Sequence, residues 1–146
     1  MTGNFKVFPD SNIWLYALTN QDEDRKQKAE DLVEENEERI CISTQVINEV
    51  CLNLKRKASF DESAVSRLIS SFYLNHAVVE LNREILLEAS ELRMKYSFSF
   101  WDGLIVAAAM AANAEVLYSE DMQNGLLVEN KLKIINPFIQ NPKSKI

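Results

Sequence analysis

Three acidic residues follow predicted strands, and a fourth heads the helix that precedes the last of these strands. The three are Asp10, Glu49 and Asp121, and the fourth is Asp102. Asp10 and Asp121 directly follow predicted strands, whereas Glu49 follows one by a helical turn or two. Ligands of an open parallel sheet bind outside the carboxyl ends of its strands, so we expect the four carboxylates at one edge. Carboxylates within a few ångströms of one another raise one another's pKa. A divalent cation relieves their repulsion. Because all-oxygen ligands select hard ions, the pattern predicts a site for Mg²⁺ or Mn²⁺ that also contacts phosphate.

Each acid also has a simpler structural interpretation. Asp10 and the two residues after it are good helix caps. Asp102 lies three residues after Ser99, and a carboxylate in the first turn of a capped helix is favoured by the helix dipole. Glu49 lies away from the centre of its helix's apolar stripe, which is typical of a solvent-facing glutamate. The recurrence of acids where strands give way to helices is what favours a metal site.

Strands and helices alternate along the sequence. Strands are expected at 5–8, 39–43, 76–79, 115–118 and 132–135, and helices at 13–18, 21–38, 44–57, 59–72, 83–96 and 99–112. Ser43 or Thr44 is expected to cap the third helix, and Ser59 with Glu62 has the spacing of a capping box. This alternation predicts right-handed crossovers and a three-layer α/β/α domain spanning 1–146, with a central parallel sheet of four to five strands.

The helix expected at 99–112 is unusual because every residue from Gly103 onward is apolar or glycine. A helix that is apolar on all sides runs through the interior, where a charge is expensive. Asp102 therefore lies in the first turn of a helix that we expect to be buried.

Composition sets the broad class. The chain has 146 residues, the size of one ordinary domain, and no apolar run long enough to cross a bilayer. Its start, MTGNFKVFPD, lacks the features of a secretory signal, so we expect a cytoplasmic protein. Cys41 and Cys51 match no zinc or redox spacing and are expected to be buried, reduced thiols.

The net charge of −6 is unevenly distributed. The segment Asp22–Arg39 holds nine acids and four bases, a net of −5, so the rest of the chain carries −1. Without the four proposed metal ligands, that remainder is +3. The acidic balance thus describes one helix face and leaves an RNA substrate open.

Taken together, four weak motifs in order resemble a known family. They are Asp10 with Asn12 after the first strand, STQVINEV with Glu49, SFWDGLIVAAA with Asp102, and LYSED with Asp121. In this order and spacing the sequence resembles PIN-domain ribonucleases of the VapC-like type, the toxins of toxin–antitoxin pairs. The resemblance covers nearly the whole chain. The sequence departs from the family's pattern at Pro9, where an aliphatic residue is usual, and at Glu120, a second acid beside Asp121.

The resemblance implies a role for each residue of the site. Asp10, Asp102 and Asp121 would hold Mg²⁺ or Mn²⁺, and Glu49 would act through a coordinated water. Asn12 and Ser119 match positions that support the site by hydrogen bonding. The expected reaction is hydrolysis of an RNA phosphodiester, in which the metal polarises a phosphoryl oxygen and activates water. Basic residues that we expect to contact phosphate are Lys55, Arg56, Lys57, Arg93 and Lys95; the first three also complement a helix dipole.

The sequence was also compared with three other functions that use similar residues. A phosphotransferase or phosphatase with Asp10 as nucleophile would need a second aspartate where this chain has Asn12. A nucleotide-binding domain would need a glycine-rich loop, and the chain has three scattered glycines. The alternative that is not an enzyme is a catalytically silent PIN-like module that binds RNA or a protein.

Partners are implied by the resemblance alone. Similar toxins bind a small antitoxin, and many form homodimers. Trp14, Leu15 and Tyr16 are apolar residues suited to such contacts, although their pattern favours packing in the core.

Overall fold

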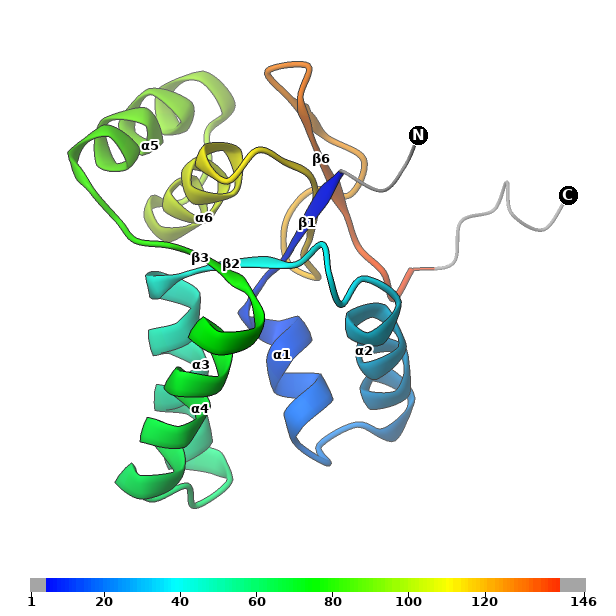
Figure 1. The fold of residues 1–146 in the computed structure, drawn as a ribbon. Helices are drawn as coiled ribbons and strands as arrows, with labels where there is room; N and C mark the ends of the chain where they lie inside the picture. Colours follow the sequence, from blue (N-terminus) through cyan, green and yellow to red (C-terminus); the bar gives the residue numbers. More distant parts are fainter. Residues whose placement is uncertain (1–4, 140–146) are drawn as a thin grey trace, which may run out of the picture.

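The computed structural model describes residues 5–139 of the chain, and strands and helices alternate along them. The elements are β1 (Lys6–Pro9), α1 (Ser11–Leu18), α2 (Glu23–Glu35), β2 (Cys41–Ser43), α3 (Thr44–Lys57), α4 (Glu62–Asn75), β3 (Ala77–Val79), α5 (Arg83–Tyr96), α6 (Phe100–Ala111), β4 (Ala114–Tyr118), β5 (Leu127–Val128) and β6 (Leu132–Ile135). Figure 1 shows β1 leading directly into α1, with α3 and α4 on the same side of the molecule.

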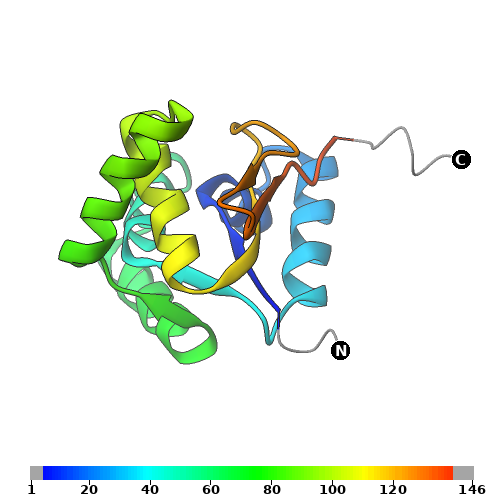
Figure 2. The same ribbon diagram turned by 90° about the horizontal axis from the view of Figure 1, so that it is seen from above.

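The main sheet has the strand order β1-β4-β6-β5. β4 pairs in parallel with both β1 and β6. Figure 2 shows α5 and α6 on one side of these strands and α2 on the other. The predicted three-layer α/β fold is therefore confirmed.

Two features of the sheet differ from the expectation of one parallel array. The strands β2 and β3 pair with each other, and a single bridge between Val7 and Ile40 links this part of the chain to β1. Strand β5 was not predicted and runs antiparallel to β6. The reason is the short connection between them, in which Glu129 and Asn130 have φ angles of +53° and +57°. Such positive φ values are typical of tight hairpin turns, which join antiparallel strands.

Helix α6 is the buried helix that the sequence predicts. Each residue from Gly103 to Ala109 is buried. Ser99 caps the helix, because its Oγ accepts a hydrogen bond from the Asp102 backbone N–H at 3.2 Å. A Cβ at Gly103 would lie 2.5 Å from Cγ of Arg93, so the glycine lets α5 pack closely against α6.

The helix caps follow the sequence with one exception. Ser43 caps α3 and Ser99 caps α6, as predicted. The capping box expected at Ser59 is wrong, because α4 begins later and Oδ1 of Asp61 accepts from Ala64 N–H at 2.8 Å. Ser59 instead takes a φ of +58° in the turn between α3 and α4.

The remaining expectations concern the interior and the membrane. Cys41 and Cys51 are both free and buried, as predicted. Trp14 and Leu15 lie in the core. The Trp14 ring packs edge to face on the Phe72 ring, with 5.1 Å between the ring centroids. These two side chains therefore pack in the core and are not surface contacts for a partner. Among residues 5–139, no helix combines the length and apolar character needed to cross a bilayer.

Candidate active site

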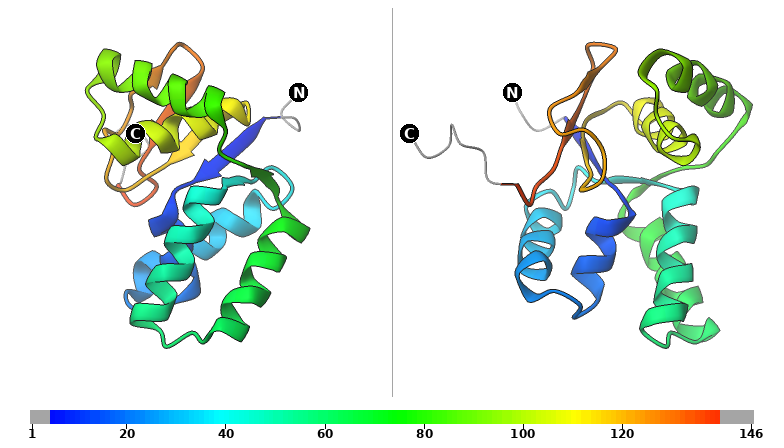
Figure 3. Two further views of the ribbon diagram at one scale, coloured as in Figure 1. Left: turned by 90° about the vertical axis from the view of Figure 1, so that its left-hand side faces the viewer. Right: turned by 180° about the vertical axis from the view of Figure 1, so that it is seen from behind.

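A polar cleft of about 450 Å³ lies beyond the ends of β1 and β4 and is bordered by α1, α3 and α6. Figure 3 shows α1 to α4 grouped on one side of the molecule and α5 and α6 on the other. All four acids singled out in the sequence line this cleft: Asp10, Glu49, Asp102 and Asp121. Four segments far apart in the chain therefore supply carboxylates to one space.

Asp10 is held from two directions as it leaves β1. Its Oδ1 accepts from the Ser11 backbone N–H at 2.7 Å, so it caps α1. Its Oδ2 accepts from the hydroxyl of Ser119 at 3.2 Å. The pKa of Asp10 is raised to about 6, chiefly by burial and also by the nearby charges of Glu49 and Asp102, while the two hydrogen bonds oppose the shift. The structure thus keeps this carboxyl where its negative charge is costly.

Glu49 reaches the cleft from the middle of α3. The buried face of this helix includes Val46 and Val50, and Glu49 lies to one side of it, partly exposed. Its Oε1 accepts from the hydroxyl of Ser11 at 2.5 Å and its Oε2 from Gln45 Nε2 at 3.2 Å. A side chain that periodicity alone assigns to solvent is therefore held in the cleft by hydrogen bonds.

Asp102 and Asp121 face the same space from α6 and from the segment after β4. Burial raises the pKa of Asp102, and the charges of Asp121 and Glu49 add to the shift. Asn12 donates from Nδ2 to Oδ2 of Asp121 at 2.8 Å. The two residues expected to support the site, Asn12 and Ser119, thus each bond directly to one of its acids.

The structure separates Asp121 from its acidic neighbour. Glu120 does not line the cleft. Its two oxygens accept from the hydroxyl of Tyr16 at 2.6 Å and from Nε of Arg25 at 2.7 Å. Glu120 therefore ties the segment after β4 to α1 and α2, and Asp121 is the acid that faces the cleft.

The donors of the cleft suit a hard divalent cation. They are carboxylate oxygens that repel one another, and among the residues that line the cleft only Lys57 is basic. Within residues 5–139, no three acidic, histidine or cysteine side chains stand close enough to share one ion as they are arranged. In this arrangement Glu49 accepts a hydrogen bond from Ser11, and Asp121 accepts one from Asn12. The chemistry of the donor set fits Mg²⁺ or Mn²⁺, and the present conformers are those of hydrogen-bonded carboxylates.

The five basic residues expected to contact phosphate fall in different places. Lys57 lines the cleft, and the other four do not. Lys55 pairs with Glu62 at 2.6 Å and Lys95 with Glu129 at 2.8 Å.

Arg93 and Arg56 complete this set. Arg93 donates to the Phe100 carbonyl oxygen at 3.0 Å and stacks on the Phe100 ring, so it joins α5 to the start of α6. Arg56 is exposed on α3, outside the cleft. Lys57 is therefore the predicted phosphate contact that the fold brings to the acids.

Several polar residues of the cleft were not singled out from the sequence. Ser11 and Gln45 bond to Glu49, and Asn53 donates to the Glu49 carbonyl oxygen at 2.8 Å. The helix carries a signal that identifies most of them, because Gln45, Glu49, Asn53 and Lys57 recur at every fourth position of α3. Residues at this spacing share one face of a helix. For Ser11, helix capping conceals the role.

Comparisons with known proteins agree with this arrangement. Residues 7–123 match the sequence profile of the PIN domain. No curated protein sequence matches the chain significantly.

Solved structures give a similar result at low identity. VapC20 of Mycobacterium tuberculosis, a sarcin-ricin loop cleaving toxin, superposes with a TM-score of 0.67 at 19% identity, over 80% of this chain and 90% of that one. A toxin–antitoxin complex from Klebsiella pneumoniae gives a TM-score of 0.68 at 18% identity, covering 91% and 98%. VapBC2 from Rickettsia felis, bound to a DNA fragment from its promoter, gives 0.61 at 19% identity, covering 90% and 100%. At this level of identity, the superpositions describe a shared fold.

Proposed function

Because this chain belongs to the PIN domain family, we propose that it is a Mg²⁺- or Mn²⁺-dependent endoribonuclease, and specifically a VapC-like toxin. One observation carries the proposal: carboxylates from four separate segments line one cleft beyond the ends of β1 and β4. Two of them have a raised pKa through burial and mutual charge, which is how a site that awaits a cation is expected to behave. The description of VapC20 as a sarcin-ricin loop cleaving toxin supports the choice of substrate class.

In this proposal Asp10, Asp102 and Asp121 hold the metal, and Glu49 positions a water. When held by these residues, the ion would supply Lewis-acid polarisation of a phosphoryl oxygen and a water nucleophile of lowered pKa. Ser119 and Asn12 orient two of the acids through the hydrogen bonds described above. Ser11 bridges two acids, because its backbone N–H bonds to Asp10 and its hydroxyl to Glu49.

The test is cleavage of single-stranded RNA by the purified protein with Mn²⁺, followed by addition of a chelator. We expect cleavage with Mn²⁺ or Mg²⁺, complete loss with the chelator, and recovery when excess metal is restored. RNA binding without cleavage under every metal condition would instead support a silent PIN-like module. One observation favours that alternative, namely that residues 5–139 as arranged do not group three acidic, histidine or cysteine side chains around one ion.

Lys57 provides a separate prediction about the substrate. Replacing Lys57 with alanine should weaken RNA binding and reduce the slope of log affinity against log salt by about 0.7, the value for one phosphate contact on a single strand. The measurement is a salt titration of binding to a short RNA. Arg56→Ala is the matched control, because Arg56 is the adjacent base on the same helix and lies outside the cleft. An equal loss of slope in both variants would contradict a specific role for Lys57.

The proposal also includes a protein partner. Several of the similar structures are toxin–antitoxin complexes, so we expect a small antitoxin encoded beside this chain and inhibition of cleavage when it binds. Co-expression with the adjacent small reading frame tests this, and light scattering of the purified chain tests for a homodimer.

A further inference from the structure

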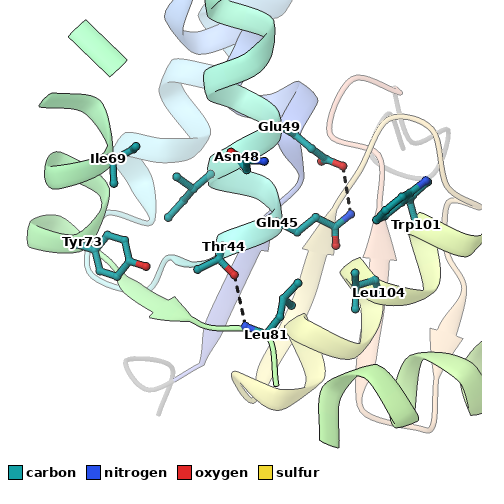
Figure 4. Close-up of a pocket in the computed structure, with 10 residues that line it drawn as sticks. Thr44, Gln45, Asn48, Glu49, Ile69, Tyr73, Leu81, Trp101 and Leu104 are labelled. Atoms are coloured by element: carbon teal, nitrogen blue, oxygen red, sulfur yellow. Dashed lines mark hydrogen bonds between the residues drawn. The ribbon is translucent and has the colours of Figure 1, made fainter. Parts of the chain in front are cut away.

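A second cavity adjoins the cleft and is of the opposite character. It is an apolar groove of about 680 Å³ between α4, α3 and α6. Figure 4 shows Trp101 and Leu104 of α6 on one side, Ile69 and Tyr73 of α4 on the other, and residues of α3 between them. An apolar cavity of this size beside a catalytic cleft is suited to holding part of a substrate.

The groove and the cleft are neighbours with shared walls. Gln45, Glu49 and Trp101 line both. The polar residues at every fourth position of α3 lead from Gln45, in the groove, through Glu49 to Lys57, at the far end of the cleft. At 1.5 Å per residue this stripe extends about 18 Å, long enough for more than one nucleotide. A chain that binds a phosphate near Lys57 can therefore reach the groove.

Trp101 is the residue most available for stacking. Its side chain is 60% exposed although it is large and apolar, and it lies beside Asp102. The other tryptophan, Trp14, is 5% exposed in the core. An exposed aromatic ring at the edge of a nuclease cleft offers a flat surface on which a base of any type can stack.

Gln45 adds a polar contact to this surface. It is only 9% exposed, and its Nε2 is used by Glu49. Its Oε1 is buried and accepts no hydrogen bond from any residue in the described part of the chain. A buried acceptor without a donor is costly, and a ligand with an amino group removes that cost. The exocyclic amines of cytosine, adenine and guanine are such donors.

We propose that the groove binds an unpaired base of the RNA substrate, with Trp101 as its stacking surface and Gln45 as an acceptor for its exocyclic amine. This proposal rests on the proposed function, because it takes the ligand of the neighbouring cleft to be RNA. Trp101 is then a positioning residue, which places the adjacent phosphate over the acids. The proposal predicts that the protein has affinity for RNA bases in addition to affinity for the sugar-phosphate backbone.

The experiment measures binding of octacytidylate to the Asp102→Asn protein with Mn²⁺, a background in which the oligomer stays intact. Trp101→Ala should weaken binding about tenfold or more, and Trp101→Phe should restore most of it, since phenylalanine also stacks. An octamer of abasic ribose phosphates should bind equally to all three proteins. In the parent, octacytidylate should change the tryptophan fluorescence, because Trp101 is the exposed tryptophan.

The matched control is Leu74→Ala, because Phe100, the neighbour in sequence, packs its ring against the Trp101 ring at a centroid distance of 5.2 Å. Leu74 is an apolar residue of α4 that is 85% exposed, and it lines neither cavity. We expect it to change affinity by less than a third of the Trp101→Ala effect. Octauridylate, a pyrimidine without the exocyclic amine, should bind more weakly than octacytidylate, and equal affinity would overturn the role of Gln45.

Unchanged affinity in Trp101→Ala, with no change in fluorescence, would overturn the proposal and leave the groove to a protein segment. The cleavage assay with wild-type protein separates this result from a failure of the proposed function. Cleavage that is independent of Trp101 refutes only the base-binding groove. Base binding that depends on Trp101, without any cleavage, supports the groove and refutes the nuclease.

Discussion

Replacing Asp102 with asparagine is expected to reduce the rate of RNA cleavage by at least about 100-fold, because even residues that merely support metal ligands cost 10–100-fold when they are changed. Asparagine keeps the size of the side chain but offers a neutral oxygen to the metal. The fold should be unaffected, since Ser99 caps α6 through the backbone N–H of residue 102. Removing a charge whose pKa is raised by burial should also not lower the free energy of unfolding. Single-turnover cleavage with Mn²⁺ and thermal unfolding measure the two effects.

Glu120→Gln is the matched control for this loss. It also neutralises one carboxylate near the cleft, but that carboxylate binds Arg25 and Tyr16. We expect a lower free energy of unfolding and near wild-type cleavage once the protein is folded. Metal-dependent cleavage at the wild-type rate by Asp102→Asn would refute the assignment of Asp102.

Replacing Asp10 with asparagine should stabilise the metal-free protein at pH 8 by about 2–3 kcal/mol, from a pKa of about 6 in the folded state against 3.8 for the ordinary group. The folded state binds the proton more tightly than the unfolded chain, so ionisation of Asp10 opposes folding. The penalty is absent below pH 3.8, grows as the pH rises, and is complete above pH 6. Asparagine does not ionise, and its side-chain oxygen can still accept from Ser11 N–H.

Urea unfolding of the two proteins at several pH values, with chelator present, measures this difference. The stability gain of Asp10→Asn should disappear as the pH falls to about 4. With Mn²⁺ the order should reverse, because a ligand stabilises only the state that binds it and the variant has lost one metal ligand. A gain that is constant from pH 4 to pH 8 would show that the charge of Asp10 is not its cause.

The local elements and the order of the acids follow from the amino-acid sequence. Hydrophobic periodicity identified α3 and α5, and the unbroken apolar run after Gly103 identified the buried helix α6. These signals are local, because the face that a helix buries depends on residues three and four positions apart. The acids were recognisable for a similar reason, since their positions after strands follow from the chain order.

Which side chains meet depends on how the elements pack in three dimensions. Whether Glu49 faces water or the cleft depends on Ser11, which is 38 residues away. Asp121 rather than Glu120 faces the cleft because Arg25 and Tyr16 bind Glu120. Hydrogen bonds and ion pairs of this kind are set by the packing of distant elements and leave no periodic trace in the sequence.

The same reason explains why strand β5 and the positions of the basic side chains were not predicted. Strand β5 has only two residues, too few for a periodic pattern, and it forms because a tight turn returns it to β6. Lys57 and Lys55 carry the same charge on the same helix, yet one lines the cleft and the other pairs with Glu62. The sequence shows which side chains are charged. Only the folded chain shows which surface each of them faces.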